Sequence, residues 1–290
     1  MAKTKQTQPA GLGIIAGSGS MPISVAKAAE AAGRPIHVIA LHDTAHKDIE
    51  AFPHTWVKLG EVGRVLKILK NNGCKQLAIV GGIRRPDFST IKFDMGAFAN
   101  LPEILNLTVG GDNSVLTAIV SFFEKKGFEV IGAQDIATDL LVSAGPVGRR
   151  RPGKKDLKDI EIGLNVVTAL GALDVGQCAV VASQYVLAVE AAEGTDQMLV
   201  RCKDLRQWGV EKKNKRSGVL IKCAKPGQER RIDLPTVGPQ TVRGAIEAGL
   251  AGMALAANNV LMIDREEMIQ LADEAGIFII GVEASPSTDL

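Results

Sequence analysis

The segment from Lys225 to Thr241, KPGQERRIDLPTVGPQT, carries the residue types best suited to chemistry in this chain. It combines acidic and basic side chains with Pro235, Gly238 and Pro239. Proline and glycine at that density exclude a helix interior, so we expect a loop or strand end that holds several charges near one point. Mixed acid and base on a rigid loop suits a site that handles both a phosphate and a cation. The competing interpretation is a solvated charged turn.

A second acidic group, EAAEGTD, occupies residues 190–196 and follows an apolar run. Because Gly194 breaks any helix there, we expect its three carboxylates to converge at a turn. Grouped carboxylates commonly hold a hard cation such as Mg²⁺, which prefers oxygen ligands and often works beside substrate phosphates. Asp233 of the first segment is a further candidate, either as a metal ligand or as the group that orients water. The candidate ligands for Mg²⁺ are therefore Glu190, Glu193, Asp196 and Asp233.

A glycine turn near the start of the chain is a candidate phosphate site. The sequence GSGSMP follows a short apolar run and precedes a helical pattern. Gly17, Ser18 and Gly19 would let the backbone approach a ligand closely, and free amides at a helix start favour an anion. Pro22 replaces the third glycine of the dinucleotide fingerprint, so NAD binding is disfavoured. A purely structural tight turn fits the same residues equally well.

Two further motifs lie later in the first half. GGIRRPDFS (81–89) follows a predicted strand at the edge where open parallel sheets bind ligands, and Arg84 and Arg85 could grip phosphate oxygens there. A salt-bridged surface loop is the alternative for this arginine pair. GGDNSVL (110–116) places Asp112 at a helix start, where it could contact substrate, although helix capping also explains an aspartate.

The bulk composition bounds the class of protein. A chain of 290 residues with 46% hydrophobic and 23% charged residues suggests a globular protein of two domains. A net charge of +2 and 4% aromatic residues argue against a nucleic-acid binder. The four scattered cysteines form no CxxC pair, which argues against a zinc site or a disulfide framework and favours a cytoplasmic location. No apolar run approaches the length of a membrane span.

Strand and helix patterns alternate through the first half of the chain. We expect strands over 12–15, 35–41, 76–80 and 128–131, and helices from Pro22 onward and over 59–69 and 112–126. This alternation predicts an α/β fold with an N-terminal, Rossmann-like, doubly wound parallel sheet.

The second half predicts a distinct C-terminal α/β domain. We expect helices over 156–169, 241–248 and 265–274, and strands over 179–182, 186–189, 218–223, 260–263 and 277–282. Glycines, prolines and three consecutive arginines before it indicate a linker, whose basic residues could also attract an anionic membrane surface. The predicted organisation is a leader (1–10), an N-terminal domain (11–143), a linker (144–155), a catalytic domain (156–284) and a tail (285–290).

Taken together, these stretches resemble the UDP-2,3-diacylglucosamine pyrophosphatases of lipid A biosynthesis, of the type unrelated to calcineurin-like phosphoesterases. The matching stretches run in family order from about Gly11 to Val282, and they are IIAGSGSMP, GGIRRPDFS, GGDNSVL, LAVEAAEGTDQML and KPGQERRIDLPTVGPQT. The resemblance implies Mg²⁺-dependent hydrolysis of UDP-2,3-diacylglucosamine to UMP and 2,3-diacylglucosamine 1-phosphate. It also implies that the lipid-bearing ligand lies in a cleft between the two domains.

The resemblance further implies roles for individual residues. Asp233 lies in the family's DLP motif and is implied to be catalytic, through metal binding or activation of water. Glu193 and Asp196 of the EGTD motif are implied to be catalytic as well, in contact with metal or phosphate. Implied substrate-binding residues, whose basic members would neutralise phosphate charge, are Thr195, Lys225, Gln228, Arg231 and Thr241. Family resemblance also implies a homodimer. Because the implied substrate is a lipid, we expect this cytoplasmic protein to make peripheral contact with the inner face of the inner membrane.

Two positions depart from the family pattern. The chain has Asp112-Asn113 where members often carry two aspartates, and Ala256-Ala257-Asn258 where they tend to have Glu-Ala-Gly. If either lost acid contacts metal or substrate, activity could be reduced or the substrate altered. The first alternative is therefore a non-catalytic homologue that binds lipid or nucleotide without turnover. A nucleotide-dependent oxidoreductase, suggested by the glycine turn and the parallel sheet, is the second alternative.

Overall fold

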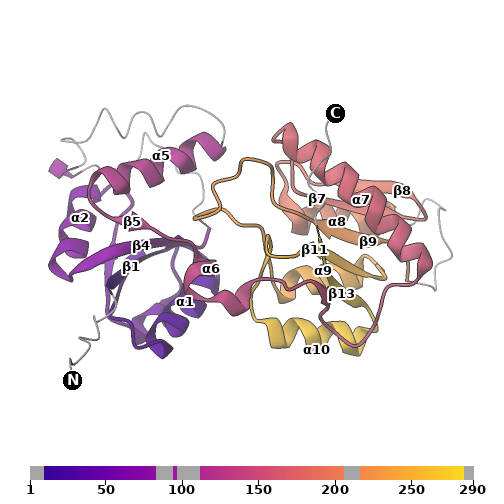
Figure 1. Ribbon diagram of the computed structural model, residues 1–290, viewed down its shortest axis with the longest axis horizontal. Coiled ribbons are helices and arrows are strands. Elements are labelled where there is room, and N and C mark those ends of the chain that lie inside the picture. Colours follow the sequence, from indigo (N-terminus) through magenta and orange to yellow (C-terminus); the bar gives the residue numbers. More distant parts are fainter. Residues whose placement is uncertain (1–9, 83–93, 97–111, 206–215, 284–290) are drawn as a thin grey trace, which may run out of the picture. The chain divides into compact units, whose positions relative to one another are not determined.

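The computed structural model describes residues 10–82, 94–96, 112–205 and 216–283, and the chain divides into two compact units (Figure 1). Unit 1 comprises Met1–Thr138 together with the short segment Glu229–Asp233. Unit 2 comprises Asp139–Gln228 and Leu234–Leu290. The segment Glu229–Asp233 therefore belongs to unit 1, although unit 2 precedes and follows it in the sequence.

Unit 1 contains a five-stranded parallel sheet in the order β3-β2-β1-β4-β5, which confirms the Rossmann-like prediction. Its strands are β1 (Gly11–Ala16), β2 (Ile36–Leu41), β3 (His54–Val57), β4 (Cys74–Val80) and β5 (Glu129–Val130). Its helices are α1 (Met21–Ala31), α2 (Val62–Asn71), α5 (Asp112–Lys125), α6 (Ala133–Ile136) and the 3-10 turn η1 (Lys47–Ala51).

Local chemistry explains these elements. Strand β1 is buried along almost its whole length, as expected of a central parallel strand covered on both faces. Pro22 stands in the first turn of α1, where its missing N–H costs no helical hydrogen bond. Helix α2 places Val65 and Leu69 on one buried face, and both belong to the core of the sheet.

Unit 2 contains a mixed six-stranded sheet in the order β6-β13-β11-β9-β7-β8. The central strands β9, β11 and β13 are parallel, whereas β6, β7 and β8 pair antiparallel with their neighbours. These strands are β6 (Gly145–Pro146), β7 (Cys178–Ala182), β8 (Tyr185–Val189), β9 (Val219–Lys222), β11 (Gly252–Ala256) and β13 (Phe278–Val282). A separate parallel pair joins β10 (Thr236–Val237) to β12 (Leu261–Met262). The distinct C-terminal α/β domain is thus confirmed.

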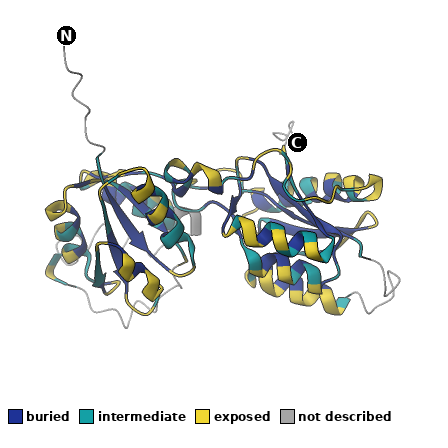
Figure 2. Ribbon diagram, turned by 90° about the horizontal axis from the view of Figure 1, so that it is seen from below, coloured by how far each residue is buried: buried dark blue, intermediate teal, exposed yellow. Residues whose placement is uncertain are grey.

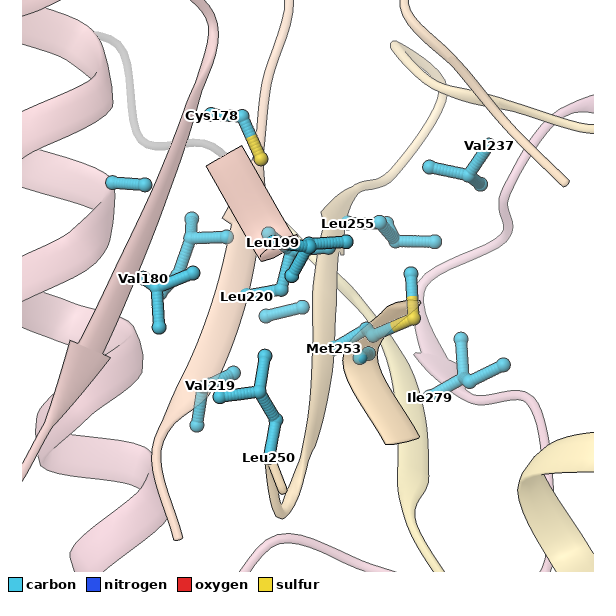
Figure 3. Packing of buried hydrophobic residues seen from close by; sticks show 14 of the residues in the cluster. Cys178, Val180, Leu199, Val219, Leu220, Val237, Leu250, Met253, Leu255 and Ile279 are labelled. Atoms are coloured by element: carbon cyan, nitrogen blue, oxygen red, sulfur yellow. The ribbon is translucent and has the colours of Figure 1, made fainter. Parts of the chain in front are cut away.

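Four helices and one 3-10 turn complete the described part of unit 2, and they are α7 (Lys154–Ala172), α8 (Gly194–Leu205), α9 (Pro239–Glu247), α10 (Arg265–Ala275) and η3 (Thr138–Leu140), which begins at the boundary with unit 1. Helix α7 packs on β7 and β9, where Gly163 allows close approach to Ile221. Leu220 points to the opposite face of β9 and lies beside Leu199 of α8 (Figure 3). The helices turn buried sides inward and exposed sides to solvent (Figure 2).

Several local expectations differ from the structure. Gly194 does not prevent a helix: α8 begins at this residue, whose φ of +78° is readily adopted by glycine at a helix start. Residues 144–155, expected as a linker, contain β6 paired with β13 and the first residues of α7. The sequence patterns also missed β3, β10 and β11. Among the described residues, no helix is long and apolar enough to cross a membrane.

Candidate functional site

The best-organised polar site of unit 2 lies at one edge of its six-stranded sheet. Strands β8 and β9 run in the same direction because both are antiparallel to β7. They therefore end at the same edge, β8 with Val189 followed by Glu190, and β9 with Lys222. The carboxyl edge of parallel strands is where ligands bind in open α/β sheets.

Three buried polar side chains meet at this edge. The Thr195 hydroxyl donates a hydrogen bond to Glu190 Oε1 at 2.6 Å, and Lys222 Nζ donates to Thr195 Oγ1 at 2.9 Å. Lys222 Nζ also donates to the Thr236 carbonyl oxygen at 3.1 Å, while the Gln177 N–H donates to Glu190 Oε2 at 3.1 Å. Relative exposure is 7% for Glu190, 9% for Thr195 and 5% for Lys222. Buried charges are stable only when they are hydrogen-bonded, which this network achieves.

The KPGQ segment extends the same network. The side chains of Gln177 and Gln228 lie 3.5 Å apart, joined from Nε2 of Gln228 to Oε1 of Gln177. Gln228 Oε1 accepts the backbone N–H of Lys225 at 3.0 Å. The Lys225 ammonium forms an ion pair with Asp174 at 2.8 Å. Two predicted substrate-binding residues, Lys225 and Gln228, therefore join Glu190 and Thr195 in one part of unit 2.

Three further predicted site residues of unit 2 lie outside this network. Glu193 and Asp196 are exposed, and Thr241 lies at the start of α9. Glu193 is exposed, and its own backbone N–H together with Arg201, 2.7 Å away, holds its pKa below the usual range. Asp196 is exposed in the first turn of α8. Thr241 is buried in the first turn of α9, where its N–H donates to the Gly238 carbonyl oxygen.

The three carboxylates of unit 2 predicted to hold Mg²⁺, which are Glu190, Glu193 and Asp196, form no metal-binding group in the part of the chain that the structure describes. Within it, no group of three or more histidine, cysteine, aspartate or glutamate side chains is placed to hold a metal ion. Both oxygens of Glu190 accept hydrogen bonds, and Glu193 pairs with Arg201. Asp233 lies in unit 1 rather than in unit 2.

Two charged residues of the segment Glu229–Asp233, Glu229 and Arg231, are paired within unit 1. Arg231 contacts Glu229 through Nε and Nη2, each at 2.7 Å, and Glu124 through Nη1 at 2.7 Å. Hydrogen bonding to Arg231 holds the pKa of Glu229 below its usual value, and that to Glu229 raises the pKa of Arg231. The backbone N–H of Asp233, a half-buried residue, donates to the Glu229 carbonyl oxygen at 3.0 Å. This segment is a charged loop, as predicted, with Arg231 bound to two carboxylates.

The glycine turn after β1 is joined by backbone to the turn after β4. The Ser18 N–H donates to the Gly82 carbonyl oxygen at 2.8 Å, and Ser18 Oγ donates to the same oxygen at 3.0 Å. A Cβ atom at Gly17 would lie 2.6 Å from that oxygen. Gly19 has a φ of +88° with open space around it. Close backbone approach explains Gly17 without any ligand, and the positive φ explains Gly19.

Three predicted contacts fall where no side chain is described. Arg84 and Arg85 lie outside the described residues. Asp112 is the first residue of α5, as predicted, but its side chain also lies outside them.

Sequence reasoning missed Lys222 and Gln177. Lys222 ends the apolar strand VLIK, so a single charged residue after three buried ones was available as a signal. Gln177 precedes a buried strand and makes its contact to Glu190 through the backbone, which its residue type does not indicate.

Comparison with known proteins identifies relatives over nearly the whole chain. Residues 11–140 match the family model described as the LpxI N-terminal domain, and residues 143–280 match the LpxI C-terminal domain. The chain is 40% identical over 272 residues to a curated protein of Caulobacter vibrioides named UDP-2,3-diacylglucosamine pyrophosphatase LpxI. The match covers 94% of this chain and 97% of that relative.

Proposed function

Because the chain belongs to the LpxI family, we propose that it is a UDP-2,3-diacylglucosamine pyrophosphatase, a hydrolase of lipid A biosynthesis. The identity to a relative of that name over 94% of the chain is the observation that carries the proposal. The N-terminal and C-terminal domain models of the family both match, over residues 11–140 and 143–280. The oxidoreductase alternative has no comparable support.

The proposed reaction adds water across the pyrophosphate bond. A water oxygen forms a bond to one phosphorus, the bridging P–O bond breaks, and the water protons leave to solvent or to a base. The products are UMP and 2,3-diacylglucosamine 1-phosphate. The attacked group is already anionic, so basic and hydrogen-bonding side chains must stabilise the charge that develops. We assign this task to the sheet edge of unit 2, with the Lys225 ammonium and the Nε2 amide of Gln228 as the proposed donors.

Asp233 is the proposed catalytic carboxylate. It stands in the DLP motif and is half-buried, which suits a group that must reach water and yet keep a defined position. A carboxylate in that setting can accept a proton from the attacking water or orient it.

The Mg²⁺ requirement remains part of the proposal. Glu190 and Glu193 are engaged by hydrogen bonds and an ion pair, so unit 2 offers no preassembled carboxylate cage in its described residues. Asp233 is the carboxylate that we propose as the protein ligand, since oxygen ligands suit Mg²⁺. When bound, Mg²⁺ would stabilise negative charge on the phosphoryl oxygens.

The finer biological setting is also proposed from the family and the substrate. A lipid-linked UDP-sugar must be reached at a membrane, so we propose a cytoplasmic homodimer that makes peripheral contact with the inner face of the inner membrane. The arginines of the basic run offer limited support, because Arg149 pairs with Asp273, and Arg150 and Arg151 donate to backbone carbonyls.

Turnover of UDP-2,3-diacylglucosamine tests the proposal. We expect the wild type to release UMP, to stop when EDTA removes divalent ions, and to recover with added Mg²⁺. Asp233→Ala should lower kcat by about 1,000-fold, within the range expected for a general acid–base group. Asp204→Ala, which changes an exposed aspartate of α8, is the matched control and should retain wild-type turnover.

The same assay separates the proposal from the non-catalytic alternative. A folded wild type that binds the lipid substrate yet releases no UMP would establish a homologue without activity. Such a result would direct attention to Asn113 and to Ala256, which is fully buried at the end of β11.

A further inference from the structure

Lys222 is the buried lysine of the unit 2 network, and none of the motifs used to predict the site includes it. It is the last residue of β9, and its ammonium contacts the Thr195 hydroxyl and the Thr236 carbonyl oxygen. Its relative exposure is only 5%. Removing an ammonium group from water is costly, so the contacts of Lys222 must offset the cost of burying it.

The hydrogen-bond roles in this network are fixed by chemistry. A lysine ammonium can only donate, so Thr195 Oγ1 must accept from Lys222. The same hydroxyl then uses its single proton for Glu190 Oε1, at 2.6 Å. The Thr195 hydroxyl thus links Lys222 to Glu190 by two hydrogen bonds, and these bonds fix its orientation.

The neighbouring thiol does not supply the balancing charge. Cys178 lies directly opposite Lys222 across the β7–β9 pair. Burial raises the pKa of the Cys178 thiol far above its usual range, so the thiol remains protonated and neutral. Glu190, reached through Thr195, is the carboxylate that balances Lys222 in this network.

The contacts of Lys222 join three segments that the proposed reaction uses. Thr195 belongs to the EGTD motif at the start of α8. Lys222 itself leads into the KPGQ segment with Lys225 and Gln228. Thr236 follows Asp233 by three residues, at the point where the chain has re-entered unit 2. The ammonium therefore fixes the chain just after the proposed catalytic aspartate.

We propose that Lys222 is a positioning residue for the pyrophosphatase reaction, acting through the Thr195 hydroxyl and the Thr236 carbonyl. This inference rests on the proposed function. Lys222 holds the EGTD turn and the strand after Asp233 at a fixed spacing, and it need not touch the substrate. Small displacements of groups that support a reaction centre are sufficient to slow it strongly.

The experiment compares two variants. Lys222→Met keeps most of the length of the side chain and removes its charge. The control, Lys203→Met, removes an exposed lysine of α8 that pairs with Glu247. For Lys222→Met we expect kcat to fall about 10- to 100-fold while KM changes by less than about 3-fold. Amide hydrogen exchange should rise about 10-fold in peptides covering 190–198 and 234–240, with β11 unchanged. Lys203→Met should match the wild type in both measurements.

Other patterns overturn the proposal. A large rise in KM with unchanged kcat would show that Lys222 binds substrate directly. Unchanged kcat, or unchanged exchange in both peptides, would show that the ammonium positions nothing. Rescue provides a further check, because Thr195→Ser retains the linking hydroxyl and should keep most of kcat, whereas Thr195→Val should not.

A second variant covers the case in which Lys222→Met does not fold. The double variant Lys222→Met/Glu190→Gln removes both buried charges and should fold, because no unpaired ion remains. Its kcat and its hydrogen exchange are then compared with those of the wild type. A lower kcat with raised exchange in the two peptides supports positioning by Lys222, and wild-type values of both overturn it.

Failure of the proposed function gives a different result. If the wild type releases no UMP, the pyrophosphatase assignment fails, and hydrogen exchange alone decides the role of Lys222. Raised exchange in the two peptides then supports the structural role of the ammonium, and unchanged exchange overturns it.

Discussion

Both units have an edge at which parallel strands end, but different kinds of chemical group hold the two edges together. In unit 1, the turns after β1 and β4 are joined mainly through backbone groups of Ser18 and Gly82, with one further hydrogen bond from the Ser18 hydroxyl. In unit 2, the edge is held by buried side chains that carry opposite charges, Glu190 and Lys222, with Thr195 between them. A glycine motif can therefore reflect how closely two backbone segments approach, whereas a charged motif can reflect pairing inside one domain.

This difference predicts opposite sensitivities. Removing side-chain atoms from the edge of unit 1 should change its stability little. Adding atoms should lower its stability, because the turns leave almost no space at Gly17. The edge of unit 2 should suffer from the loss of single polar atoms, because each has a buried partner. Hydrogen exchange in peptides from each unit monitors unfolding locally, so the stability of each edge is measured separately.

The largest expected effect is that of Thr195→Val in unit 2. Valine keeps the shape of threonine but removes Oγ1, so Glu190 and Lys222 each lose a hydrogen bond while they remain buried. We expect the free energy of unfolding of unit 2 to fall by about 3 kcal/mol. Urea denaturation measures this, and Thr195→Ser is the matched control that should lose less than about 1 kcal/mol. Equal stability of the two variants would contradict the side-chain origin of this edge.

An intermediate effect is expected from Gly17→Ala in unit 1. The new Cβ would lie 2.6 Å from the Gly82 carbonyl oxygen and 2.8 Å from that of Gly81, so two backbone segments must separate. We expect a loss of about 2 kcal/mol in unit 1. Gly19→Ala meets open space, and its cost of about 1 kcal/mol comes from the positive φ instead. If Gly19→Ala proves the more harmful, close approach is not what selects glycine at position 17.

The smallest effect concerns Arg231→Met and depends on pH. Hydrogen bonding to Arg231 lowers the folded-state pKa of Glu229 below 4.5, so this pair stabilises unit 1 above pH 4.5. The contribution disappears as pH falls through the lowered pKa and the carboxylate becomes protonated. At pH 7 we expect the variant to lose about 1 kcal/mol, and at acid pH the two proteins should converge. A difference that stays constant across this range would contradict the linkage.

Much of the fold could be predicted from the sequence because its strands are strongly apolar. Strands such as β2 and β9 are buried runs of branched residues, and the predicted segments overlap them closely. Strand β11, GMALA, was missed although it is fully buried, since glycine, methionine and alanine carry little β-propensity. Its place between β9 and β13 is decided by tertiary packing.

The candidate site was less predictable because it depends on pairing between distant residues. The sequence identified Glu190 and Thr195 as a motif but could not show that they point at Lys222, 27 positions away from Thr195. Likewise Arg231 was predicted to meet phosphate, and the structure pairs it with Glu229 and with Glu124, 107 residues earlier. Residue types indicate which side chains need partners, and only the folded chain decides which partners they receive.

The membership of Glu229–Asp233 in unit 1 has a consequence for how the protein emerges from the ribosome. Unit 1 cannot be completed when Thr138 leaves the exit tunnel, because its last segment is still 90 residues away, beyond the stretch Asp139–Gln228. At the usual pace of synthesis that interval lasts about 5–20 s. During this interval Glu124 has been synthesised, but Arg231, its ion-pair partner in the folded chain, has not. The proposed catalytic aspartate thus joins the first domain only after most of the second has been synthesised.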